Sequence, residues 1–95
     1  MSSPLTFAFI ARIPESGVAH FNAYEDHVIA LLKEHGGELQ QRLRTADGQT
    51  EIHVLSFANQ AAFENYLDEP RRKAHAELLK ASGARTELLR MERIG

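Results

Sequence analysis

The sequence VAHFNAYEDHVIALLKEHGG, residues 18–37, decides the fold of this 95-residue chain. Its large apolar side chains recur at the three- and four-residue spacing of a helix and form a stripe about 100° wide, as in a helix that packs on a sheet. Gly36 and Gly37 can adopt the left-handed conformation that ends a helix. We therefore predict a helix over residues 18–35 that covers a sheet. Its stripe consists of Phe21, Tyr24, Val28, Leu31, Leu32 and His35.

Three of the four predicted strands are defined by alternating side chains and by turn residues. Residues 5–13 alternate large apolar side chains with smaller or polar ones, and Pro14 ends the run. Residues 38–45 alternate weakly and carry charge, which is typical of an edge strand. Asp47-Gly48 is a strong hairpin signal, so residues 50–57 are expected to return beside the edge strand.

The last third of the chain predicts a second helical region and a fourth strand. Asn59 is a good N-cap for a helix that bears Phe63, Tyr66 and Leu67. Pro70 either interrupts this helix or starts a new helical piece that runs to about Ala81. Residues 86–94 then alternate as a final strand.

This order of elements predicts an α+β, ferredoxin-like βαββαβ sandwich, in which residues 1–95 form one domain. Both helices would lie on one face of a four-stranded antiparallel sheet, so the other face would be bare and apolar. A second copy of the chain is expected to cover that face, giving a homodimer. The alternative is a monomer whose open face is partly polar through Arg12, Arg42, His53 and Glu87. The apolar side chains assigned to the open face are Ile10, Leu55, Phe57, Leu89 and Met91, or their alternates along each strand.

The composition excludes several classes of function. A net charge of −2 and an isoelectric point near 6.2 give no electrostatic basis for binding nucleic acid or an anionic membrane. The absence of cysteine excludes disulfides and thiolate metal sites, and it favours the cytoplasm. No run reaches the roughly 18 apolar residues that a membrane span requires. Residues 1–4 also lack the features of a signal peptide.

Three segments resemble the dimeric α+β-barrel superfamily: residues 34–37 (EHGG), 52–59 (IHVLSFAN) and 62–67 (AFENYL). Within it, the chain is most similar to DUF1330-like and antibiotic-biosynthesis-monooxygenase-like small proteins. It departs from the DUF1330 pattern at residues 66–71 (YLDEPR). The resemblance implies a dimeric barrel that binds small, often aromatic, molecules between helices and sheet. Members of the superfamily include cofactor-free oxygenases, isomerases and haem enzymes.

The long helix carries a row of candidate site residues, His20, Tyr24, His27 and Leu31. One hypothesis is that Tyr24 and a histidine such as His27 reach a pocket between the helices. There an imidazole could take a proton and a phenol could hold an oxyanion. The alternative is that Tyr24 lies at the edge of the core and both histidines are solvated.

Three further residues are candidates on other elements. His53 lies on a central strand, where it must be hydrogen-bonded or face a cavity, and an interface histidine is the alternative to a catalytic one. Arg12 can pair with Glu51 or Glu87, or hold an acidic ligand. Tyr66 either packs on Phe63 or lines the same pocket as Tyr24. The basic run at residues 71–73 is predicted to be a solvated face.

No phosphate loop, dinucleotide motif or metal-binding motif occurs in the sequence, so we predict neither a cofactor nor a metal. Three hypotheses for function remain. The first is a homodimer that binds a small apolar or aromatic metabolite in the cleft between helices and sheet. The second is a cofactor-free monooxygenase or isomerase that uses His27 or His53 as base and Tyr24 or Arg12 to stabilise an anion. The third is an interaction module.

Overall fold

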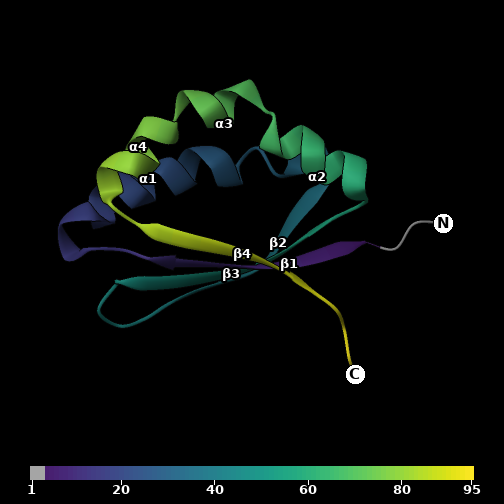
Figure 1. The fold of residues 1–95 in the computed structure, drawn as a ribbon, viewed down its shortest axis with the longest axis horizontal. Helices are drawn as coiled ribbons and strands as arrows, with labels where there is room; N and C mark the ends of the chain where they lie inside the picture. Colours follow the sequence, from purple (N-terminus) through teal and green to yellow (C-terminus); the bar gives the residue numbers. More distant parts are fainter. Residues whose placement is uncertain (1–3) are drawn as a thin grey trace.

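The computed structural model describes residues 4–95 and contains one four-stranded antiparallel sheet with all its helices on one face (Figure 1). The strand order is β2-β3-β1-β4, which is the predicted ferredoxin-like arrangement. The strands are β1 (Leu5–Arg12), β2 (Gly37–Arg44), β3 (Thr50–Phe57) and β4 (Arg85–Met91). The helices are α1 (Val18–Ile29), α2 (Gln60–Leu67), α3 (Pro70–Ala74) and α4 (Ala76–Ser82), and the 3₁₀ turns η1 (Glu15–Gly17) and η2 (Lys33–His35) flank α1.

The first helix is shorter than predicted, because its last turns tighten. The N–H groups of Leu31 and Leu32 each donate to a carbonyl three residues earlier, at 3.1 Å. This 3₁₀ pattern replaces the α-helical one after Ile29, and both leucines remain buried. Gly36 then ends the segment with φ of 69°, as predicted for a left-handed C-cap.

The second helical region consists of three short helices. Asn59 is the N-cap of α2, and its side chain accepts a hydrogen bond from the N–H of Ala62 at 2.8 Å. Pro70 starts α3 as its first residue, which settles the two alternatives for that proline. A break at His75 separates α3 from α4, and Gly83 ends α4 with φ of 70°. The final strand, β4, ends at Met91 rather than at Ile94.

The assignment of Leu55 and Phe57 to the open face is wrong. In the register of β1 and β3, Leu55 lies opposite Phe7 and Phe57 lies opposite Leu5. Opposite residues of paired strands point to the same face, so these four side chains share the core beneath the helices. Phe7 also packs edge-on against Phe57, with ring centroids 6.2 Å apart.

No helix of residues 4–95 covers the other face of the sheet (Figure 1). Leu89 and Met91 are opposite Ala8 and Thr6, in the alternation that also places Ile10 on this face. Leu89 and Met91 are both exposed. Their predicted contact with a second copy of the chain stays a prediction. Among residues 4–95, no helix is long and apolar enough to cross a membrane.

Two arginine substitutions on opposite faces test this assignment. Leu55→Arg places an unpaired charge in the core and should lower the free energy of unfolding by about 3 kcal/mol or more, measured by chemical denaturation. Met91→Arg should leave the fold intact, because Met91 is exposed, and should reduce the molar mass in light scattering if a second copy binds this face. Equal stability of the two variants would contradict the assignment of the faces.

Candidate functional site

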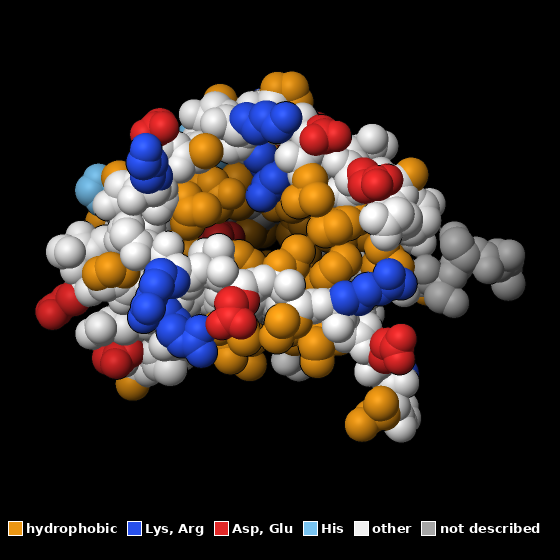
Figure 2. Space-filling model, viewed as in Figure 1, with side chains coloured by type: hydrophobic (Ala, Val, Ile, Leu, Met, Phe, Trp, Pro, Cys, Tyr) orange, Lys and Arg blue, Asp and Glu red, His pale blue; other side chains and the backbone are white. Residues whose placement is uncertain are grey.

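A cavity of about 220 Å³ lies between the helices and the sheet. In the space-filling view it is a hollow lined mainly by hydrophobic side chains, with basic side chains at its rim (Figure 2). Its walls therefore suit an apolar ligand, and polar groups are confined to part of the lining. The apolar lining residues are Phe9, Val28, Ile29, Leu32, Leu55, Phe57, Phe63, Leu67, Leu79 and Leu88, and the polar ones are Tyr24, Glu25, His53, Tyr66, Arg72 and Thr86.

The polar part of the site begins at Glu51, a fully buried carboxylate on β3. The neighbouring edge strand β2 supplies two donors, Nε of Arg42 at 2.9 Å and Nε of Arg44 at 2.7 Å. Nε2 of His53 contacts the same carboxylate. Burial raises the pKa of Glu51, but the hydrogen bonds from His53, Arg44 and Arg42 outweigh burial and hold its pKa below the usual value. Glu51 is therefore ionised at neutral pH.

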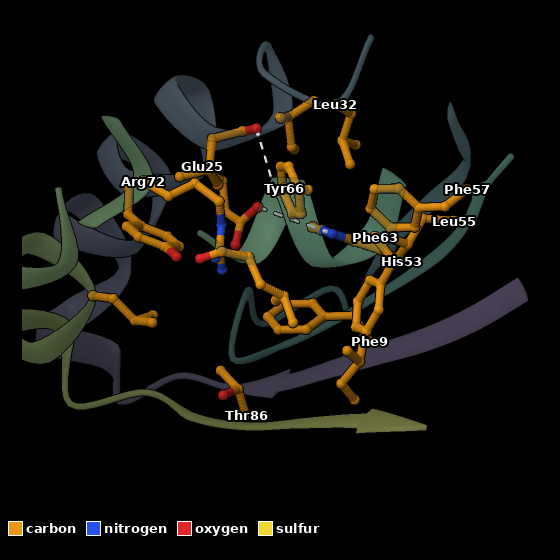
Figure 3. Close-up of a pocket in the computed structure, with 16 residues that line it drawn as sticks. Phe9, Glu25, Leu32, His53, Leu55, Phe57, Phe63, Tyr66, Arg72 and Thr86 are labelled. Carbon is orange, nitrogen blue, oxygen red and sulfur yellow. Dashed lines mark hydrogen bonds and ion pairs between the residues drawn. The ribbon is translucent and has the colours of Figure 1, made fainter. Parts of the chain in front are cut away.

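This ionised carboxylate fixes the tautomer of His53. Because Glu51 can only accept, we assign the proton of neutral His53 to Nε2, which leaves the lone pair of Nδ1 free. Nδ1 lies 3.9 Å from Oε2 of Glu25, which enters the cavity from α1 (Figure 3). Burial lowers the pKa of His53 even though Glu51 opposes that shift. At neutral pH, Nδ1 is thus an unprotonated base beside the cavity.

Glu25 is a buried carboxyl group on the helix side of the cavity. Burial, followed by repulsion from Glu51, raises its pKa to about 7. The group is therefore about half protonated at neutral pH, and its protonated form can donate a hydrogen bond. An unprotonated base, Nδ1 of His53, thus lies 3.9 Å from a weak acid, the carboxyl group of Glu25.

Tyr24 and Tyr66 both line the cavity, which is one of the two alternatives considered for each residue. Burial raises the pKa of Tyr24, and it raises the pKa of Tyr66 to about 12. Both phenols are therefore neutral hydrogen-bond donors at physiological pH. The hydroxyl of Tyr66 donates to the carbonyl of Val28 at 3.3 Å, which ties α2 to α1.

The structure places the other predicted site residues outside this cavity. Arg12 points to the open face of the sheet, where Nη1 donates to Oε1 of Glu87 at 2.9 Å. His27 is exposed on α1 and stacks on His75, with ring centroids 3.9 Å apart. Of the two histidines predicted as a base, only His53 lies at the cavity, and Arg12 is not beside it.

Two cavity residues were missed in the sequence. Glu25 lies four residues after Phe21 and three before Val28, so it occupies an apolar position of the helical stripe. A carboxylate in that position is a signal for a functional group. Arg72 belongs to the basic run predicted to be solvated, but it is half-buried and lines the cavity. The direction in which the Arg72 side chain points depends on where α3 begins and ends, and no local sequence pattern shows where these ends lie.

The arrangement suits proton transfer to or from a small ligand. Nδ1 of His53 can accept a proton, while Glu25 and the phenol of Tyr24 can donate hydrogen bonds to an oxygen that gains charge. Among residues 4–95, no group of three or more His, Asp or Glu side chains is arranged to hold a metal ion.

Replacing Glu25 by Gln should change stability in a pH-dependent way. The pKa of Glu25 is about 7 in the folded chain against an ordinary 4.5, so ionisation of Glu25 weakens the fold as pH rises from about 4.5 to 7. Over that range the stability of Glu25→Gln relative to the parent should rise by about 2 to 3 kcal/mol. Urea denaturation at several pH values measures this, with Asp26→Asn, an exposed neighbour, as control. A constant difference between Glu25→Gln and the parent would contradict the raised pKa.

Comparison with known proteins shows the fold of the chain. No family model matches it, and no curated protein matches it significantly. Solved structures do match. Rv0793 from Mycobacterium tuberculosis has a TM-score of 0.78 at 12% identity, with 98% of this chain and 97% of that chain covered. SnoaB, a cofactor-independent oxygenase from Streptomyces nogalater, has a TM-score of 0.75 at 20% identity, with the same coverage.

A third structure, a candidate antibiotic biosynthesis monooxygenase from Bacteroides thetaiotaomicron, has a TM-score of 0.79 at 13% identity and covers 97% of this chain and 90% of its own. The structural part of the resemblance is thus confirmed, while the narrower likeness to DUF1330-like proteins stays a prediction. The chain has the ferredoxin-like α+β fold of these three structures.

Proposed function

We propose that this protein binds a small apolar or aromatic metabolite in the cavity between its helices and its sheet. The observation that carries the proposal is the cavity itself, about 220 Å³ in volume and lined mainly by aliphatic and aromatic side chains. An apolar cavity of about 150 Å³ is large enough for benzene. The space therefore suits a substituted aromatic ring.

The polar groups of the lining favour a ligand with at least one oxygen. Tyr24 and Tyr66 contribute neutral hydroxyl groups, and Glu25 contributes a carboxyl group that is partly protonated at neutral pH. The hydroxyl of Tyr66 already donates to Val28, but a pure hydrocarbon would offer no partner to the hydroxyl of Tyr24 or the carboxyl group of Glu25 and would lose affinity. A ring with a hydroxyl, carbonyl or carboxyl substituent satisfies both parts of the cavity.

A catalytic form of this proposal is favoured by the contact between Glu51 and His53. Nδ1 of His53 would remove a proton from the ligand, and the resulting imidazolium would be stabilised by the ionised Glu51. The electron pair left on the ligand would spread onto its oxygen, beside the phenols. Return of the proton to another carbon gives isomerisation. Reaction with O₂ instead converts a CH₂ group to a carbonyl and releases water.

The description of SnoaB as a cofactor-independent oxygenase supports the oxygenase branch of the proposal. That support is limited to shared architecture, because the two chains are 20% identical. Binding and catalysis can be tested separately.

Two tryptophan substitutions on β4 test binding. Leu88 lines the cavity, while its neighbour Leu89 is on the open face, and both are exposed to the same extent. Leu88→Trp should fill the cavity and weaken binding of a small aromatic probe, benzamide, by about tenfold or more in calorimetry. Leu89→Trp should leave the affinity unchanged. Equal affinities of the two variants would show that the probe binds elsewhere.

Exchange of a carbon-bound proton tests catalysis. In D₂O, the protein should accelerate deuterium incorporation into 2-tetralone, an aromatic ketone with an acidic C–H, as followed by proton NMR. His53→Gln should slow the catalysed exchange by about a hundredfold, and Glu51→Gln by about tenfold. His27→Gln should exchange like the parent, because His27 is outside the cavity. If only the His27 substitution reduces exchange, the assignment of the base is wrong.

A further inference from the structure

Arg72 is a half-buried cation that lines the cavity without a carboxylate partner in the described part of the chain. Four other arginines, Arg12, Arg42, Arg44 and Arg71, are paired with carboxylates, and Arg12 contacts Glu87. Arg42 and Arg44 contact Glu51, and Arg71 contacts Glu34 and Glu69. A guanidinium ion removed from water without a counter-ion is costly. Its position therefore calls for an anionic partner beyond those that residues 4–95 place beside it.

The side chain of Arg72 is held in place by contacts with α2 and lies beside the phenols of Tyr24 and Tyr66. Its Cζ atom lies 4.6 Å from the centroid of the Tyr66 ring, and Nη1 donates to the carbonyl of Leu67 at 3.1 Å. Nε is buried and has no hydrogen-bond partner among residues 4–95. A guanidinium has five N–H donors, so this group is fixed in direction and still able to bind.

The groups that share the cavity with Arg72 do not cancel its charge near neutral pH. Tyr24 and Tyr66 are neutral because burial raises the pKa of each phenol, and burial lowers the pKa of His53. Glu25, with a pKa of about 7, is only partly ionised. The lining of the cavity thus carries a net positive charge, which favours an anion over a neutral ligand.

We propose that Arg72 binds an anionic oxygen of the ligand, so that the cavity selects small aromatic acids, carboxylates or phenolates, over their neutral analogues. The inference rests on the proposed function, since the aromatic ring must occupy the apolar part of the cavity. Within it, Arg72 determines specificity. In the catalytic form, the same guanidinium would hold the oxygen on which charge develops when His53 removes a proton.

Paired affinities for benzoate and benzamide, which differ in charge but hardly in shape, test the inference. Calorimetry at about pH 7 should show that the parent protein binds benzoate about tenfold more tightly than benzamide. Arg72→Gln should reduce this preference to within about twofold, with little change in the affinity for benzamide. Arg72→Lys should retain part of the preference, because it keeps the charge but not the planar fork.

Lys73→Gln is the matched control, because it removes the same charge from an exposed position of the same helix. It should keep the parent preference for benzoate. If Arg72→Gln keeps that preference as well, or if the parent binds both compounds equally, the role of Arg72 is overturned while the cavity proposal stands. If the parent binds neither compound, both proposals fail. Thermal unfolding of each variant shows whether a lost preference comes from lost structure.

Discussion

The pairing of Glu51 determines the arrangement of the site. Its carboxylate is fully buried in the sheet, and a buried charge is tolerated only when it is paired and hydrogen-bonded. Arg42 and Arg44 meet this need from the edge strand β2, and His53 meets it along β3 itself. The pairing of this buried charge therefore ties the edge strand β2 to β3. It also fixes the tautomer of His53 and leaves the unprotonated Nδ1 of His53 beside the cavity.

The two ends of β3 contribute different kinds of side chain to the site. Side chains two residues apart on a strand point to the same face, so Glu51, His53, Leu55 and Phe57 all lie beneath the helices. The first two are polar, and the last two belong to the aromatic and aliphatic core. On the helix side, Glu25 approaches His53, while Phe63 stacks on Phe7 with ring centroids 4.4 Å apart. A ligand would thus be oriented, with its ring on one side and its oxygen on the other.

Much of the fold could be predicted because it depends on short-range patterns. Gly36, Asn59, Pro70 and Gly83 each begin or end an element as expected from backbone chemistry. The error at Leu55 and Phe57 has a specific cause. Both faces of β1 and β3 carry apolar side chains, so alternation separates the faces without showing which one the helices cover. Part of the site was also predictable, because Tyr24, Tyr66 and His53 were identified as residues that could face a pocket.

The sequence by itself determined the order of the elements, their turns and caps, and which side chains of one strand share a face, because each depends on residues a few positions apart. Only the tertiary structure decided which histidine is buried, that Glu25 approaches His53, and that Arg72 lines the cavity while its neighbour Arg71 pairs at the surface. In the sequence, Glu25 is 28 positions from His53 and 47 positions from Arg72. The packing of helices on the sheet sets such distances, and no local periodicity encodes them.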